Sequence, residues 1–219
     1  MCGRFAFTKK DILKSRFQID QLPDELQISY NIAPGQKIPV ILNVMPEDLS
    51  LVYWGLIPHW AKDEKIGYKM INARAETIGE KPSFRGPIRR QRCLILADAF
   101  YEWKKTETAK IPHRVLLKDE DVFAMAGIWD HWRSGEKHVT SCSIITTASN
   151  SLMRPIHDRM PVILPREAER KWLSDIPFEE VQKLLKPYDP KGLRVYAISS
   201  LVNSPRNNHA GIIKPVNIE

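Results

Sequence analysis

Cys93-Leu-Ile-Leu-Ala97 is a run of five apolar residues near the middle of the chain, and such a run predicts a buried β-strand. It leads directly into Asp98-Ala-Phe-Tyr-Glu-Trp-Lys105, where charged and aromatic residues mix. Similar short apolar runs recur along the sequence, many of them bracketed by the 16 prolines. Together they predict many short strands joined by irregular loops, at residues 2–7, 39–43, 51–54, 93–97, 114–117, 122–129, 143–147, 162–164 and 195–198.

Helices are expected mainly near the two ends of the chain. Residues 8–17 predict one helix, because Thr8 can cap it and Asp11 follows three residues later. Two more are expected over residues 166–173 and, after Pro177, over residues 178–186. Strands therefore dominate the middle of the chain. The pattern predicts a single α+β domain over residues 1–219, with a curled, mostly antiparallel sheet, peripheral helices and a C-terminal tail at 209–219.

Composition excludes several classes of protein. The chain has 219 residues, 43% of them hydrophobic and 27% charged, which excludes a disordered chain. Its three cysteines are odd in number and lack CxxC spacing, which argues against a disulfide framework, a structural zinc and secretion. We therefore expect no metal and no other cofactor.

The start of the sequence and its charge bear on location and partners. No signal-peptide core and no run of about 18 apolar residues is present, so a cytoplasmic protein without a membrane partner is expected. The formal net charge of +7 favours anionic partners only modestly.

Cys2 allows two interpretations. It can be a small hydrophobic residue that opens an edge strand. Alternatively, Met1 is removed, as happens when the second side chain is small, and the chain then begins with an α-amine and a thiol on adjacent carbons. About a tenth of such an amine is neutral at pH 7. It condenses with an aldehyde to an imine, which the thiol closes to a thiazolidine; the thiol can also act as a simple nucleophile beside a base.

Residues 72–76 alternate in polarity. Asn72, Arg74 and Glu76 would share one face of an extended segment. That face is either simply exposed to solvent, or Asn72 orients a substrate while Arg74 binds a phosphate or carboxylate.

Two further groups are candidates for proton transfer. Glu102 lies between Tyr101 and Trp103 and is either a solvent-facing strand residue or a desolvated acid with a raised pKa. His157 lies in a proline-bracketed loop beside an acid and an arginine. It is either a general acid and base or a structural loop residue.

Basic and aromatic residues are interleaved in the first half of the chain, which is typical of surfaces that neutralise phosphates and stack on unpaired bases. Trp54 fits a buried strand better, whereas Trp60 follows Pro58-His59 and fits a surface. The arginines at 85, 89, 90 and 92 equally fit a solvated helix face.

Seven segments, in this order, are more specific than any one of them. They are MCGRF at 1–5, YNIAPGQ at 30–36, WGLIPHWAKD at 54–63, INARAET at 71–77, KPSFR at 81–85, FYEW at 100–103 and IHDRMP at 156–161. The set resembles the SOS-response-associated peptidase (SRAP) family of abasic-site-processing proteins, from Cys2 to about Asn208. The resemblance implies a mixed α/β fold around a curled, barrel-like sheet.

The resemblance also implies a function. Members of the family bind single-stranded DNA at an abasic site, whose open sugar presents an aldehyde, and shield the lesion with a thiazolidine DNA–protein crosslink during the DNA damage response. By motif, Cys2 is the nucleophile and Asn72 helps to recognise the lesion sugar. Glu102 assists imine and ring formation. His157 acts as acid and base on the sugar, and in crosslink reversal or lyase-type strand cleavage.

The resemblance assigns DNA contacts as well. Arg4, Arg74 and Arg159 would contact phosphates, Trp60 would lie near the strand junction, and the loop with Asn31 and Pro34 would line the cysteine pocket. The expected partner is single-stranded DNA with abasic sites. The expected protein is a monomer without an obligate protein partner, associated with the nucleoid when bound to DNA.

Two departures from the family pattern stand near these motifs. Ala99 replaces a common glycine, and His59 occupies a position more often filled by a small residue; only His59 bears on how the DNA junction is held. Two other functions stay open. One is a cysteine peptidase or amidase that uses Cys2 with His157 and Asn72 or Glu102, including self-removal of Met1. The other is a non-catalytic single-strand-binding module in which Cys2 is structural.

Overall fold

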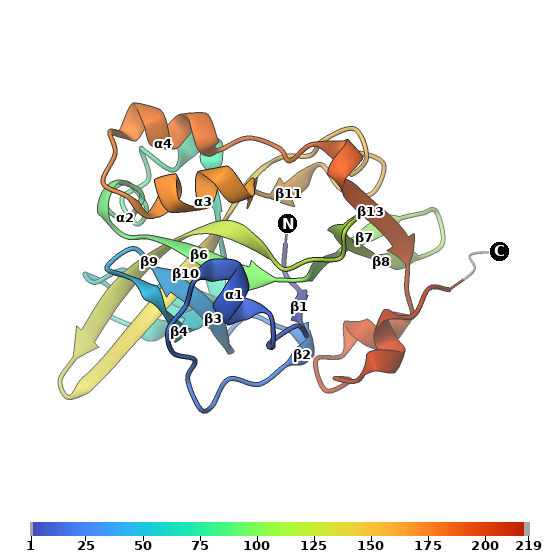
Figure 1. Cartoon of the computed structure of the whole chain (residues 1–219), viewed down its shortest axis with the longest axis horizontal. Coiled ribbons are helices and arrows are strands. Elements are labelled where there is room, and N and C mark those ends of the chain that lie inside the picture. Colours follow the sequence, from blue (N-terminus) through green and yellow to red (C-terminus); the bar gives the residue numbers. More distant parts are fainter. Residues whose placement is uncertain (1, 217–219) are drawn as a thin grey trace.

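A computed structural model describes residues 2–216 of this chain, and strands make up most of its regular structure (Figure 1). The expected removal of Met1 and the last three residues of the expected tail lie outside the described residues. The strands are β1 (Phe5–Phe7), β2 (Ser29–Ile32), β3 (Lys37–Leu42), β4 (Met45–Trp54), β5 (Asn72–Arg74), β6 (Arg92–Ala97), β7 (Ala99–Lys105), β8 (Lys110–Leu117), β9 (Phe123–Ser134), β10 (Lys137–Ala148), β11 (Arg159–Pro161), β12 (Ile163–Leu164) and β13 (Leu193–Ala197). The α-helices are α1 (Leu13–Phe17), α2 (Pro87–Arg90), α3 (Arg166–Leu173) and α4 (Phe178–Leu184), and the 3-10 helices are η1 (Glu64–Lys69), η2 (Ala75–Thr77), η3 (Pro190–Gly192), η4 (Ser200–Asn203) and η5 (Ala210–Ile213).

Five strands close into a barrel. The pairing runs β10–β4–β3–β6–β9, and β9 pairs again with β10, so the ring has no free edge between them. Each of these pairs is antiparallel except β4–β10, which is parallel. Trp54, Cys93 and Cys142 are fully buried, as expected of core residues. The structure thus confirms a single α+β domain with a curled, mostly antiparallel, barrel-like core.

A second sheet carries the start of the chain to the barrel. Its order is β13–β8–β7–β1–β2. Because Asp98 alone separates β6 from β7, the buried strand of the barrel passes directly into this sheet. Phe5 of β1 pairs with Phe100 of β7, so Cys2, just before β1, lies next to the segment that contains Glu102.

The helices α2, α3 and α4 gather on one side of the molecule (Figure 1). The bounds of α3 are those predicted, and α4 follows Pro177 as predicted but ends at Leu184. The helix predicted over 8–17 is wrong at its start, since α1 begins only at Leu13. Thr8 does not cap it: the N-cap residue is Ile12, four residues later, and the backbone N–H of Thr8 donates to the Asp98 carboxylate.

Arg92 shows that the predicted arginine cluster is not one solvated face. Arg89 and Arg90 are exposed, but Arg92 is buried. Its guanidinium donates hydrogen bonds of 2.6–3.1 Å to four backbone carbonyls, those of Ile88, Arg89, Trp172 and Ser174. Free carbonyls at helix ends attract a cation, so Arg92 joins the ends of α2 and α3.

The segment before residue 217 packs against the second sheet. Ile212 of η5 is buried, and the backbone N–H of Val216 donates to the carbonyl of Ala197 at 3.0 Å. No helix among residues 2–216 is long and apolar enough to cross a membrane.

Candidate active site

Cys2 lies three residues before the start of β1, and a side chain from a distant segment holds it. The Asn72 amide donates to the carbonyl oxygen of Cys2 at 2.8 Å. Two residues further along, the backbone N–H of Tyr101 donates to the carbonyl of Arg4 and aligns β1 with β7. The Cys2 side chain is completely buried. Burial, and secondarily the negative charge of Glu102, raises the pKa of the Cys2 thiol well above its ordinary value.

Glu102 is a desolvated acid rather than a solvent-facing strand residue. It stands on β7 between β1 and β8, opposite His113, and only 2% of it is exposed. Burial raises its pKa to about 7, and the charge of Asp158 acts in the same direction. Near neutral pH this carboxyl group is therefore present in both forms, as a general acid and base requires.

Asn72 and Arg74 lie on β5, which pairs in parallel with β10. Ala73 between them is fully buried, and the alternation leaves Asn72 half-buried and Arg74 exposed. The side-chain oxygen of Asn72 is buried and has no hydrogen-bond partner among residues 2–216. An amide that gives its N–H to Cys2 and keeps an unused acceptor is suited to a substrate hydroxyl.

His157 is fixed by the backbone around it. Its backbone N–H donates to the carbonyl of Met153 at 3.0 Å, and its Nδ1 accepts the backbone N–H of Arg159 at 3.0 Å. The neutral ring therefore carries its proton on Nε2. Asp158 approaches the same Nδ1 to 2.8 Å and would replace that amide contact on a protonated ring. Burial lowers the pKa of His157, so the ring is mainly neutral at pH 7.

The four segments predicted to carry chemistry meet around Cys2. Asn72 contacts it directly, the charge of Glu102 acts on its thiol, and Asp158, next to His157, acts on Glu102. Sequence reasoning missed Asp158 as a contributor, although it lies inside the quoted motif IHDRMP. A carboxylate beside the predicted histidine was the available signal.

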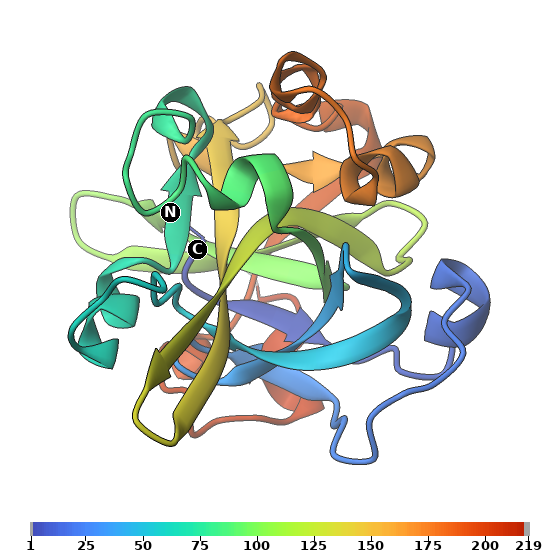
Figure 2. The same ribbon diagram turned by 90° about the vertical axis from the view of Figure 1, so that its left-hand side faces the viewer.

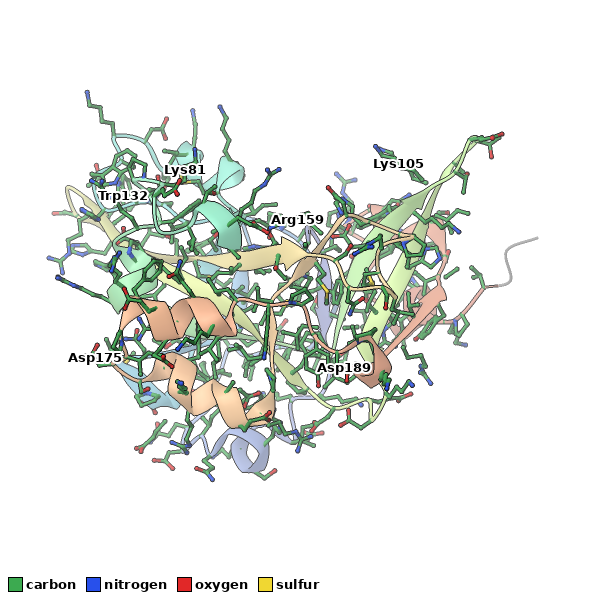
Figure 3. The ribbon with its side chains drawn as sticks, turned by 90° about the horizontal axis from the view of Figure 1, so that it is seen from above. Lys81, Lys105, Trp132, Arg159, Asp175 and Asp189 are labelled. Carbon is green, nitrogen blue, oxygen red and sulfur yellow. The ribbon has the colours of Figure 1, made fainter. Side chains whose placement is uncertain are left out.

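The arginines predicted to contact phosphates differ in whether they already bind other groups of the protein. Arg74 is exposed, whereas Arg159 forms a bidentate ion pair of 2.7 and 2.8 Å with Glu76 and donates to the carbonyl of Thr146. Arg159 lies between Lys81 and Lys105 when the molecule is seen from above (Figure 3). Arg74 is thus the arginine of this group that offers its charge most directly to solvent.

Arg4 and Asn31 form an internal network. Arg4 donates to the Asn31 side-chain oxygen at 2.9 Å and to the carbonyl of Val202 at 2.8 Å. The buried Asn31 amide donates to three carbonyls of the C-terminal segment, those of Val202, Ser204 and Asn207. In this structure both side chains therefore hold that segment against the second sheet.

The two remaining predicted DNA contacts lie at the surface. Pro34 is half-buried and precedes Gly35, whose φ of +84° favours glycine. Trp60 is 52% exposed, in agreement with the surface position expected for it. No group of three or more His, Cys, Asp or Glu side chains within the described part of the chain could hold a metal ion.

Comparison with known proteins places these residues in a family. The model of the family described as SOS response associated peptidase (SRAP) matches residues 1–205. The abasic site processing protein YoqW of Bacillus subtilis is 51% identical over 222 residues, which cover 98% of this chain and 99% of that protein. The abasic site processing protein HMCES of Xenopus tropicalis is 33% identical over 257 residues, covering 95% of this chain and 76% of that protein. A crystal structure of a protein from Bacteroides thetaiotaomicron superposes with a TM-score of 0.89 at 34% identity, covering 99% of this chain and all of that one.

Proposed function

This chain belongs to the SOS response associated peptidase (SRAP) family, and we propose that it processes abasic sites in single-stranded DNA by forming a covalent crosslink through Cys2. The names of its relatives support abasic sites as the target. The observation that carries the chemistry is the cluster in which Asn72 holds Cys2 at 2.8 Å while the charge of buried Glu102 acts on its thiol.

The first step is imine formation. Once Met1 has been removed, the α-amine of Cys2 adds to the aldehyde carbon of the open sugar, and a proton passes from nitrogen to oxygen. Glu102 in its acid form then protonates the hydroxyl that leaves as water. A pKa of about 7 keeps a large fraction of Glu102 in that form at neutral pH.

The second step closes the ring. The Cys2 sulfur adds to the carbon of the protonated imine, whose nitrogen keeps its proton, and the thiol proton returns to the Glu102 carboxylate and restores its acid form. Amine, thiol and aldehyde thus become a thiazolidine and one water, and nothing is oxidised or reduced. A thiol kept protonated by burial is suited to this step, because its proton replaces the one that Glu102 gave to the leaving water.

His157 and Asn72 act on the sugar in this proposal. The neutral His157 ring takes a proton from the sugar hydroxyl and returns it to the ring oxygen, which opens the cyclic sugar to the aldehyde. The Asn72 side-chain oxygen accepts a hydrogen bond from the sugar. His157, as acid and base, also supports crosslink reversal and a lyase-type cleavage of the strand.

The strand is held mainly through its phosphates. Exposed Arg74 makes one contact, and Arg159 and Arg4 make others when DNA competes with their internal partners. Trp60 stacks at the strand junction, and the loop with Asn31 and Pro34 shapes the cysteine pocket. One protein molecule traps one lesion, so a monomer suffices, and DNA binding would associate the protein with the nucleoid.

A peptidase that uses the Cys2 thiolate is less well supported. Thiol peptidases need a lowered thiol pKa, whereas burial and Glu102 raise that of Cys2. Self-removal of Met1 is the limited form of this activity that remains compatible with the proposal.

The test mixes purified protein, with Met1 removal verified by mass spectrometry, with single-stranded DNA that contains one abasic site. A denaturing gel should show a covalent band for the wild type and none for Cys2→Ala. Alanine also permits Met1 removal, so this control keeps the amine and loses only sulfur. Borohydride should restore a band for Cys2→Ala by trapping its imine. A wild-type protein with a free Cys2 amine and no band would contradict the proposal.

A further inference from the structure

A second histidine–carboxylate pair lies outside the cluster around Cys2. His59 Nδ1 is 3.0 Å from the Asp130 Oδ2 atom, and the backbone N–H of His59 donates to the same oxygen at 2.9 Å. The two side chains differ sharply in exposure, 68% for His59 against 5% for Asp130. A buried carboxylate therefore holds a ring that reaches into solvent.

Asp130 is itself firmly placed on β9. Its other oxygen accepts the backbone N–H of His131 at 2.8 Å and the side-chain N–H of Gln91 at 3.3 Å. Four N–H groups thus converge on this carboxylate and fix its position. With Nδ1 turned to Asp130, the His59 ring presents Nε2 to solvent, beside exposed Trp60.

The residue spacing along strand β10 gives the distance between this pair and the candidate active site. Ser141 of β10 pairs with Asp130, and its hydroxyl accepts the backbone N–H of Ile57 at 2.8 Å. Further along the same strand, Ile144 pairs with Asn72 and Thr146 with Arg74. At about 3.3 Å per residue, the His59 pair lies roughly 10 Å along the strand from Asn72 and roughly 17 Å from Arg74. Figure 2 shows β5 beside β10, the long strand that runs up the front of this view.

We propose that His59 binds a phosphate of the DNA strand a few nucleotides from the abasic site, with Asp130 as its positioning residue. The proposal rests on the proposed function, because it takes DNA as the ligand. A ring with protons on both nitrogens donates Nδ1–H to Asp130 and Nε2–H to the phosphate. The ring then lies between two anions, each of which accepts one of its N–H groups.

The fold does not need the imidazole at this position. The backbone N–H of His59 already binds Asp130 and holds the turn, and a smaller side chain would keep that bond. Among residues 2–216, Asp130 is the ionisable side chain recorded in contact with the ring. An exposed imidazole that a buried carboxylate orients toward solvent is instead suited to an external anion.

The experiment measures non-covalent binding of undamaged single-stranded DNA at pH 6.0 over a range of salt concentrations. His59→Ser and His59→Gln should weaken binding about three- to tenfold at low salt. Each should also lower the slope of log K against log salt by about 0.7, the loss of one phosphate contact. His138→Gln, an exposed histidine on β10, is the matched control and should change neither quantity.

Asp130→Asn should lower the slope of log K against log salt as much as His59→Ser does. The variant with both substitutions should lower it no more than either single substitution. Thermal unfolding checks that each variant is folded. If Asp130→Asn does not fold, His59→Ser still tests the proposal, because it keeps the backbone bond to Asp130. Weaker binding with an unchanged slope would indicate a base contact and overturn the proposal, as would unchanged binding. Crosslinking of abasic DNA by the wild type is measured in parallel, and a wild type that fails to crosslink would overturn the proposed function separately.

Discussion

The helical side of the barrel and the pocket around Cys2 each bury one ionisable side chain, and the two side chains differ in their protonation near neutral pH. Arg92, 1% exposed, gives four hydrogen bonds to carbonyls at the ends of α2 and α3. Glu102, 2% exposed, has a pKa raised to about 7 by burial. Arg92 remains a cation at any physiological pH, whereas Glu102 changes its protonation near neutrality.

The difference separates a structural charge from a reactive one. A buried ion whose hydrogen bonds are satisfied stabilises one arrangement of the backbone. A buried acid poised near pH 7 can give and take a proton. Burial is the same in both cases, but the ordinary pKa of an arginine lies far above neutrality, whereas burial brings the pKa of Glu102 to about 7.

Glu102→Gln tests the reactive side of this comparison and has the largest expected effect. Glutamine neither gives nor takes a proton, so the rate of crosslinking at pH 7 should fall by about a hundredfold or more. Gel time courses measure that rate. Glu107→Gln, an exposed glutamate beyond the end of β7, is the matched control and should react at the wild-type rate. A rate for Glu102→Gln within a few-fold of the wild type would remove Glu102 from the mechanism.

Arg92→Met tests the structural side. It leaves the carbonyls of Ile88, Arg89, Trp172 and Ser174 without their donor, and should lower the free energy of unfolding by about 3 kcal/mol or more. Denaturant titration measures the loss, and exposed Arg90→Met should stay within about 0.5 kcal/mol of the wild type. The crosslinking rate per folded molecule should not change; a slower rate would mean that Arg92 also acts on the site.

The pH dependence of stability sharpens the comparison further. The pKa of Glu102 is raised in the folded state from 4.5 to about 7, so between these values the unfolded chain binds fewer protons than the folded one. The free energy of unfolding contributed by this group therefore falls as pH rises from about 4.5 to 7. The expected loss is on the order of 3 kcal/mol.

Glu102→Gln should remove that slope, so the difference in stability between wild type and variant should shift in favour of the variant as pH rises. Thermal or denaturant unfolding at pH 5, 6, 7 and 8 measures it. A constant difference over that range would mean that Glu102 is ionised normally in the folded protein.

Arg74→Ala has the smallest expected effect, because Arg74 is exposed and contributes one phosphate contact. Binding of single-stranded DNA should weaken a few-fold, and the slope of log K against log salt should fall by about 0.7. The free energy of unfolding should barely change. An unchanged salt slope would exclude a phosphate contact at this position.

Local patterns predicted most of the strands but not how they pair. The apolar run at 93–97 and the alternation at 51–54 correspond to parts of β6 and β4. The closure of β9 on β10, and of β10 on β4, depends on contacts between distant segments and has no local signal. The early start predicted for α1 failed for a similar reason, since the Thr8 N–H binds Asp98, ninety residues away.

In the candidate site too, the residues could be predicted from local motifs, whereas their burial and pairing could not. Cys2, Asn72, Glu102 and His157 follow from their motifs, because each motif holds a chemically distinctive residue. Burial of Glu102 could not be read from its neighbours, since it results from β1 and β8 on its two sides. The pairing of His59 with Asp130 likewise depends on the turn after β4 lying against β9.

In the proposed crosslink, both the nitrogen and the sulfur of Cys2 join the abasic sugar in one ring. Peptide mapping by mass spectrometry tests it most directly on protein crosslinked without reductant. We expect a Cys2 peptide that carries the sugar with loss of one water, and a Cys2 sulfur that no longer reacts with iodoacetamide although Cys93 and Cys142 still do after denaturation. A sugar attached to another residue, or a crosslinked Cys2 whose sulfur is still alkylated, would contradict it.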